Sequence, residues 1–276
     1  MLELPESVTL SKQISKNLAG KTVQAVMAAQ SPHKFAWFSG DPQEYPSRLM
    51  GSTFLSAEAH GPFVQVNTSA ATLLFSDGVN LRWHPEAGPV PSKHQLLLEF
   101  MDGTALSASV GMYGGLLCWE QGQKLENAYY QTACEKPSPL SGGFDMAYFK
   151  DLVSSAKVQK LSLKAALATE QRIPGLGNGC LQDILWLARL NPRQKVFGLS
   201  DSEIERLFST LNQTLSSMTE FGGRNTEKDL FGKPGAYPVI MCASTASSPC
   251  PRCGGAIVKE AYLGGSVYYC PSCQPR

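Results

Sequence analysis

The sequence has no long run of apolar residues and no signal for export. No run approaches the roughly 20 consecutive apolar residues that cross a bilayer as a helix. The first residues, Met1 to Glu6, are acidic and contain a proline, which is unlike a secretory signal peptide. We therefore expect an intracellular protein with no membrane partner, located in the cytoplasm, or on the nucleoid if the source is bacterial.

A disulfide framework is also missing. The chain contains eight cysteines, and four of them fall in two C-x-x-C pairs near the C-terminus. The other four show no regular spacing: Cys118, Cys134, Cys180 and Cys242. Such a pattern is typical of proteins from reducing compartments, which agrees with an intracellular location.

Net charge is low, and no internal repeat is visible. The formal charge is only +1 at pH 7. Residues 151–276 contain 14 Lys and Arg against 10 Asp and Glu, whereas residues 1–150 contain 10 against 13. Basic residues are therefore concentrated in the second half. This excess is modest, so a solvated surface of mixed sign explains it nearly as well as a nucleic-acid contact.

The strongest motif is a pair of C-x-x-C knuckles, Cys250/Cys253 and Cys270/Cys273, separated by sixteen residues. Four thiolates from two such turns can surround one zinc ion at about 2.3 Å. Between the knuckles, two strand-like runs, 256–258 and 266–269, flank a turn at Leu263-Gly264-Gly265. The pattern predicts a two-stranded zinc ribbon. Two roles stay open for it: a structural staple, or a ribbon whose tip contacts nucleic acid.

The rest of the chain predicts an α+β multidomain protein. A first helix is expected over Pro5–Leu18, and eight short strands between residues 21 and 122 indicate a β-sandwich or a flattened barrel. A segment rich in Pro, Ser and Gly near residues 134–143 marks a boundary. We expect an N-terminal helix and sandwich domain (1–130), a helical domain (131–240) and the zinc ribbon (241–276). The expected strands are 23–26, 35–38, 53–57, 63–66, 72–75, 96–100, 104–109 and 116–119.

Within the helical domain, a glycine-rich turn precedes a helix. Helices are expected over 149–156, 161–168 and 179–189, and Ser200 with Glu203 predicts a capping box at the start of a last long helix. The turn is Pro174-Gly175-Leu176-Gly177-Asn178, where Asn178 can cap the next helix. Free N–H groups at such a helix start favour an anion, and a phosphate would suit the site. Plain turn chemistry explains the glycines as well.

Taken in order along the chain, these motifs resemble the formamidopyrimidine-DNA glycosylase and endonuclease VIII family. The resemblance covers essentially the whole chain. It rests on Glu3-Leu4-Pro5-Glu6, Lys93-His94 before the strand that ends at Asp102-Gly103, Gly175–Asn178, Asp229–Gly235 and the four cysteines. It implies a two-domain protein with a helix-two-turns-helix domain that holds kinked duplex DNA between its domains and flips a damaged base out of the stack.

The resemblance also implies roles for individual residues. In this family the amine exposed by loss of the initiator Met attacks the sugar C1′, and a Schiff base and strand cleavage follow. Glu3 then corresponds to the glutamate that handles protons at the sugar. Acidic residues at a helix start also stabilise the helix without any reaction. The implied DNA contacts are Lys164, Gly175, Gly177, Asn178, Arg193 and Lys233.

The chain departs from the family pattern where catalysis would occur. Leu2 stands where the family has its nucleophilic proline. Because aminopeptidases remove Met only before a small residue, we expect Met1 to be retained, which leaves the amine of Met1 as a substitute nucleophile one residue away.

Three further positions depart from the pattern. His60 is the nearest substitute for a catalytic lysine, and it also fits a plain surface histidine. Met112 and Tyr113 replace an arginine and an aromatic residue, and they are candidates to wedge into the base stack or to pack in a loop. The ribbon tip, 263–266, carries no basic residue.

Three functions follow from these observations. The chain is a repair glycosylase and abasic-site lyase acting on damaged duplex DNA, a non-catalytic binder of damaged or distorted DNA, or a scaffold that binds protein instead. The near-neutral charge permits the third.

Overall fold

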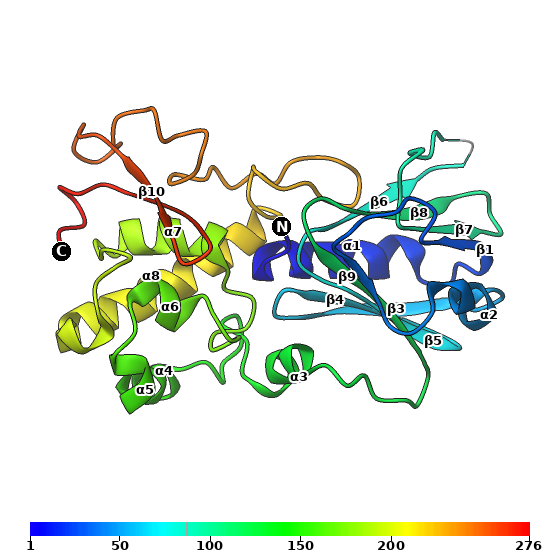
Figure 1. Cartoon of the computed structure of the whole chain (residues 1–276), viewed down its shortest axis with the longest axis horizontal. Coiled ribbons are helices and arrows are strands. Elements are labelled where there is room, and N and C mark those ends of the chain that lie inside the picture. The colour runs from blue at the N-terminus through cyan, green and yellow to red at the C-terminus, as the bar shows by residue number, and fades with distance from the viewer. Residues whose placement is uncertain (87) are drawn as a thin grey trace.

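The computed structural model describes residues 1–86 and 88–276 and consists of two halves lying side by side (Figure 1). One half is rich in strands and the other is helical, and the C-terminal ribbon lies on the helical half. Helix α1 (Leu4–Leu18) runs from the junction into the strand-rich half. The expected domain limits of 1–130, 131–240 and 241–276 stay predictions.

The strand-rich half contains a four-stranded sheet in the order β1-β7-β8-β6 and a five-stranded sheet in the order β2-β9-β5-β4-β3. All eight predicted strands are present. The ninth, β6, was not predicted, although Val79 and Leu81 alternate with Asn80 and Arg82 in the pattern of a half-buried strand. The strands are β1 (Val23–Ala28), β2 (Ala36–Phe38), β3 (Phe54–His60), β4 (Phe63–Thr68), β5 (Ala71–Phe75), β6 (Val79–His84), β7 (Leu96–Phe100), β8 (Ala105–Val110) and β9 (Gly114–Glu120).

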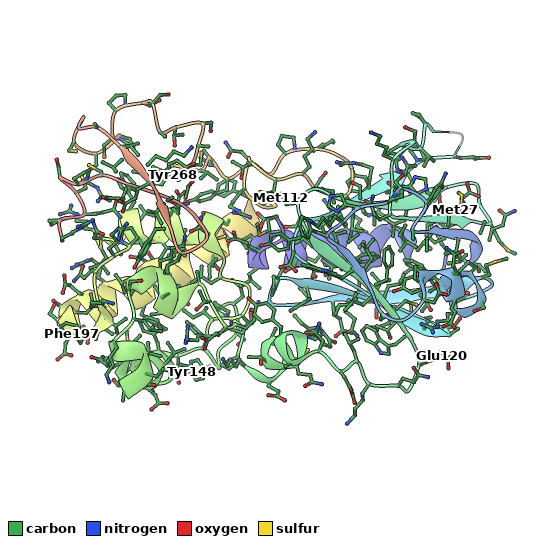
Figure 2. All side chains as sticks on the ribbon, in the orientation of Figure 1. Met27, Met112, Glu120, Tyr148, Phe197 and Tyr268 are labelled. Carbon is green, nitrogen blue, oxygen red and sulfur yellow. The ribbon has the colours of Figure 1, made fainter. Side chains whose placement is uncertain are left out.

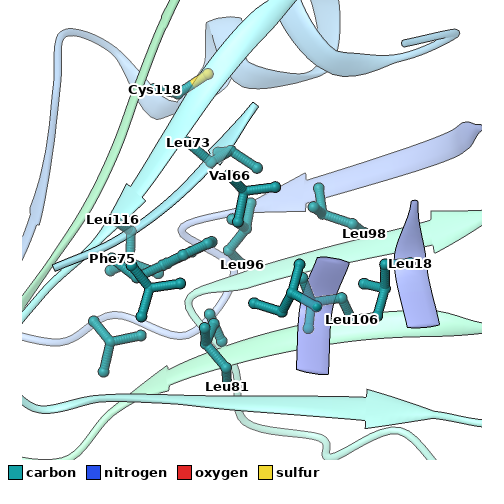
Figure 3. Packing of buried hydrophobic residues seen from close by; sticks show 14 of the residues in the cluster. Leu18, Val66, Leu73, Phe75, Leu81, Leu96, Leu98, Leu106, Leu116 and Cys118 are labelled. Atoms are coloured by element: carbon teal, nitrogen blue, oxygen red, sulfur yellow. The ribbon is translucent and has the colours of Figure 1, made fainter. Parts of the chain in front are cut away.

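The two sheets pack around one apolar core (Figure 3). Alternate side chains of each strand point inward, as in Leu96 and Leu98 of β7. Helix α1 adds Leu10, Ile14 and Leu18 to this core, four residues apart on one face. Leu4, at the start of the same helix, belongs instead to the core of the helical half. The first helix therefore joins the two halves.

The helical half is built mainly from α7 and α8, which pack through buried leucines. The capping box is confirmed: the amide of Glu203 donates to the Ser200 hydroxyl at 3.3 Å, and the amide of Ser200 donates to the Glu203 carboxylate at 2.9 Å. The short helices α2, α3 and α5 were not predicted. The helices are α2 (Tyr45–Leu49), α3 (Ala128–Glu135), α4 (Met146–Ser154), α5 (Ala156–Gln159), α6 (Leu163–Leu167), α7 (Asn178–Leu187) and α8 (Asp201–Glu220), with 3₁₀ turns η1 (Pro42–Glu44) and η2 (Val196–Gly198).

None of the helices in the described parts of the chain has both the length and the apolar content that crossing a membrane would require.

The ribbon consists of β10 (Val258–Tyr262) and β11 (Gly265–Tyr269), which pair antiparallel. The turn at Leu263-Gly264 lies where it was predicted, and both residues have a positive φ, +49° and +74°. The first strand was predicted too early, because it begins rather than ends at Val258. Gln274 attaches the ribbon to the helical half by donating to the carbonyl of Leu190 at 2.8 Å.

Candidate functional site

A cleft of about 420 Å³ lies where the N-terminus, both halves and the ribbon tip meet. Figure 2 shows Met112 at this junction. The cleft brings together segments that are far apart in the sequence, among them most of the predicted site residues. Its walls include Met1, Leu2, Glu3, Asp77, Met112, Tyr113, Lys164, Gly175, Gly177, Asn178 and the ribbon tip from Leu263 to Gly265.

The carboxylate of Glu3 occupies the start of helix α7. It accepts hydrogen bonds from the amides of Gly177 at 3.1 Å, Gly179 at 2.7 Å and Cys180 at 2.9 Å. Burial raises the pKa of Glu3. The charge of Arg224 and the hydrogen bonds from Cys180 and Gly179 lower the pKa by more than burial raises it, so the pKa of Glu3 lies below its usual value. Glu3 is therefore held as a carboxylate.

This arrangement corrects two expectations about the glycine-rich turn. Gly177, and not Asn178, is the N-cap residue of α7, and Asn178 is its first helical residue. The amides that were expected to bind a phosphate already bind an anion, which is the side chain of Glu3. An anion therefore binds at this helix start, as the sequence predicted, but the anion is the Glu3 carboxylate of the same chain and not a phosphate.

Arg224 completes the site, and no motif in the sequence pointed to it. Its guanidinium lies 3.2 Å from Glu3 and 2.8 Å from Glu6, and it also donates to the carbonyl of Met1 at 3.1 Å. The amide of Arg224 donates to Glu6 at 3.0 Å. All three charged side chains are buried. The only hint along the chain was the Gly222-Gly223 pair before Arg224, which lets the backbone approach Glu6.

The glycines of the turn are required by close packing. A Cβ on Gly177 would lie 2.5 Å from the Glu3 carboxyl carbon, and one on Gly179 would overlap the Arg224 guanidinium. Gly175 has a φ of +77°, and its Cβ would lie 2.7 Å from the backbone of Gly61 in the β3–β4 turn. The turn is therefore shaped to fit the N-terminal segment and the strand-rich half.

The backbone nitrogen of residue 2, where the resemblance places the family's nucleophile, is hydrogen-bonded. The amide of Leu2 donates to the carbonyl of Asp77 at 2.6 Å, and the Leu2 side chain is buried in the sandwich core. The amine of Met1 forms an ion pair with Glu227. Met1 also contacts the cleft wall, because its sulfur lies 3.7 Å from the Tyr113 hydroxyl.

The structure brings Lys164 and Asn178 to the ribbon tip. The ammonium of Lys164 donates to the carbonyl of Tyr262 at 2.5 Å, and the side-chain amide of Asn178 donates to the carbonyl of Ser266 at 2.9 Å. Burial lowers the pKa of Lys164. Their assignment to DNA stays a prediction.

The other predicted contacts lie outside the cleft wall. Arg193 is paired with Glu260 at 2.6 Å and stacks on the Tyr262 ring at 4.1 Å. Lys233 is exposed on the loop after α8. His60 packs against the Tyr130 ring, 5.8 Å between centroids. Pro62, two residues further along, lines the cleft instead.

The four cysteines of the ribbon fit one zinc ion. Their sulfur atoms lie within 4.8 Å of one another, with 3.9 Å between Cys250 and Cys273 and 3.5 Å between Cys253 and Cys270. A tetrahedron with Zn–S bonds of about 2.3 Å has S···S edges of about 3.8 Å. The indole N–H of Trp186 donates to Cys250 at 3.4 Å, a contact typical of groups that orient metal ligands. A zinc ion held by these four sulfur atoms would stabilise the ribbon fold.

Comparison with known proteins identifies the family. Residues 136–229 match the formamidopyrimidine-DNA glycosylase H2TH domain, and residues 247–276 match the "Zinc finger found in FPG and IleRS". The formamidopyrimidine-DNA glycosylase of Neisseria meningitidis serogroup A is 30% identical over 285 residues, which cover 99% of this chain and 100% of that protein. The chain belongs to the formamidopyrimidine-DNA glycosylase family. The same enzyme from Lactobacillus delbrueckii subsp. bulgaricus is 26% identical, with 100% of both chains covered.

Solved structures of the family share the fold. Lactococcus lactis formamidopyrimidine-DNA glycosylase matches with a TM-score of 0.83 and 23% identity, covering 99% of this chain and 100% of that one, both in its complex with DNA containing N7-benzyl-Fapy-dG and in its complex with DNA containing an abasic site. The predicted family, α+β fold and zinc ribbon are thereby confirmed.

Proposed function

We propose that this family member binds damaged or distorted duplex DNA in base-excision repair without forming a Schiff base through the nitrogen of residue 2. The family gives the DNA-binding part of the proposal, since the relatives are glycosylases and the solved neighbours are complexes with damaged or abasic DNA. DNA would lie across the cleft and would contact the helix-two-turns-helix turn and the ribbon.

The non-catalytic part of the proposal rests on one observation: the Leu2 nitrogen and the Glu3 carboxylate are both already hydrogen-bonded within the protein. With Met1 retained, as expected before a leucine, the Leu2 nitrogen is a peptide amide that donates to the carbonyl of Asp77, and an amide lone pair is not nucleophilic. Glu3 accepts three backbone hydrogen bonds and faces Arg224. Taking up or releasing a proton there would break this network, so Glu3 is poorly suited to proton transfer at a sugar.

The predicted DNA contacts, Lys164, Gly175, Gly177, Asn178, Arg193 and Lys233, should grip phosphates weakly. Arg193 is neutralised by Glu260, and Lys164 already donates to Tyr262. Each phosphate that is left without a cation reduces the slope of log affinity against log salt by roughly 0.9. We expect weak binding with a shallow salt dependence, and Met112 and Tyr113 would enter the base stack where a base is missing.

A second function is favoured by the position of Met1. Met1 is 41% exposed and lines the cleft, so its amine could react with an abasic sugar once it is released from Glu227. This would give a lyase with an unusual nucleophile. The two functions differ in one product, a covalent adduct that borohydride reduces.

Binding is tested by fluorescence anisotropy with a duplex containing an abasic-site analogue and with the intact duplex, at low and at physiological salt. We expect tighter binding to the abasic duplex and a shallow salt slope. Absence of binding to both duplexes at low salt would contradict the proposal and would favour a protein-binding scaffold.

A further inference from the structure

The rim of the cleft carries a group of large exposed side chains that the fold does not use. Strand β2 alternates: Ala36 and Phe38 pack on the sandwich core, so Trp37 between them points outward, and Phe35 lies in the turn just before the strand. Trp37 is 49% exposed and Phe35 is 47% exposed. β2 runs parallel to β9 with Trp37 opposite Gly115, which places Trp37 next to the turn that carries Met112 and Tyr113.

These side chains form one surface, the rim patch, defined as Phe35, Trp37, Met112 and Tyr113. The rings of Trp37 and Tyr113 are 6.0 Å apart between centroids, and Met112 is 63% exposed. Met112 and Tyr113 also line the cleft, so the rim patch continues directly into it. Clustered exposed apolar side chains of this size usually mark a binding surface.

The charges around the cleft indicate what this surface binds. Two carboxylates, Glu3 and Asp77, and two ammonium groups, Lys164 and the Met1 amine, belong to residues that line the cleft. Lys164 is already bonded to the ribbon, and the Met1 amine is paired with Glu227. Phosphate attraction inside the cleft is therefore small. At the outer edge of the patch, the exposed Lys34 lies 5.3 Å from the Phe35 ring centroid, where it can meet a phosphate. The aromatic rings and the Met112 thioether can stack on a nucleobase that has left the duplex, and the Lys34 ammonium at their edge can contact its phosphate.

We infer that the rim patch is a stacking platform for unpaired nucleobases, and that Trp37 and Tyr113 determine a preference for DNA with an unpaired base over fully paired DNA. This inference rests on the proposed DNA-binding function and adds that the protein selects DNA by the presence of an unpaired base. Stacking on aromatic side chains does not depend on base identity, so the preference is independent of sequence.

The test measures affinity for a matched duplex and for the same duplex with one unpaired thymine. The variants are Trp37→Ala, Trp37→Phe, which keeps a ring, and Phe197→Ala, which removes an aromatic side chain that is 68% exposed on the helical half. Zinc content and thermal midpoint of each variant check that folding is unchanged. We expect Trp37→Ala to lose roughly 5- to 150-fold in affinity for the unpaired-base duplex, with little change for the matched one. Trp37→Phe should retain most of the affinity, and Phe197→Ala all of it.

Each outcome decides one question. If Trp37→Ala binds both duplexes as the wild type does, DNA binding stands and the platform is wrong. If the wild type binds the two duplexes equally, the preference is wrong. If the wild type binds neither duplex at low salt, the proposed function fails and the platform fails with it.

Discussion

The guanidinium of Arg224 lies 3.2 Å from the carboxylate of Glu3, and both side chains are buried. The pair joins the start of α1 to the loop that follows α8, and through Glu3 it reaches the first turn of α7. Two carboxylates, Glu3 and Glu6, share this one cation. The junction between the halves therefore depends on Arg224.

Replacing Arg224 by Met should destabilise the protein strongly. Methionine keeps much of the length but leaves two buried carboxylates without a cation, which typically costs about 3–5 kcal/mol in free energy of unfolding. Chemical denaturation measures the loss. Arg224→Lys, which keeps the charge but not the forked geometry, should lose less. Equal stability of wild type and Arg224→Met would show that the pair does not hold the junction.

Replacing Asp77 by Asn should stabilise the protein at neutral pH. Burial raises the pKa of Asp77 above its ordinary value of 3.8, although Ser76 donates to it and lowers the pKa in part. A carboxyl whose folded pKa is raised costs stability when ionised, and this cost disappears as the pH falls through the folded pKa toward 3.8. The φ of +55° at residue 77 also suits Asn.

For Asp77→Asn, the thermal midpoints of variant and wild type are compared at pH 7 and at acidic pH. The gain should be largest at pH 7 and should shrink on acidification. Asp151→Asn, at an exposed position on α4, is the control and should show no such trend. A gain that grows on acidification would contradict the assigned direction.

Replacing Gly179 by Ala should disrupt the start of α7. The added methyl group would overlap the Arg224 guanidinium, so the Glu3–Arg224 pair must move. We expect a loss of at least about 1–3 kcal/mol, the usual cost of overpacking. Gly198→Ala is the matched control, because nothing lies within 4 Å of its Cβ position. Equal unfolding free energies for the two variants would rule out the close approach.

Removing zinc should unfold the ribbon. Metal analysis should give one zinc per chain, and Cys253→Ser should reduce the zinc content and expose Trp186, whose indole contacts Cys250. The change is followed by tryptophan fluorescence. Cys134→Ser changes an exposed cysteine outside the cluster and should retain both zinc and the wild-type spectrum. A zinc-free chain with an unchanged spectrum would contradict a structural role.

The features that follow local rules were predictable from the sequence. Strand alternation, the Ser200–Glu203 capping box and the cysteine spacing each depend on a few neighbouring residues, and all three are present. The contacts that define the site depend on distant partners. Arg224 is 221 positions from Glu3, and Lys164 is 98 positions from Tyr262. No local pattern reveals such pairs, so the anion site at α7 was predicted and its internal ligand was not.

The most direct test of the account is borohydride trapping of the wild-type protein with a duplex containing an abasic site, alongside binding to the same duplex. The engaged nitrogen of Leu2 and the paired amine of Met1 predict binding without a reduced covalent adduct. A trapped adduct attached to the N-terminal residue would contradict the account and would make the protein a lyase.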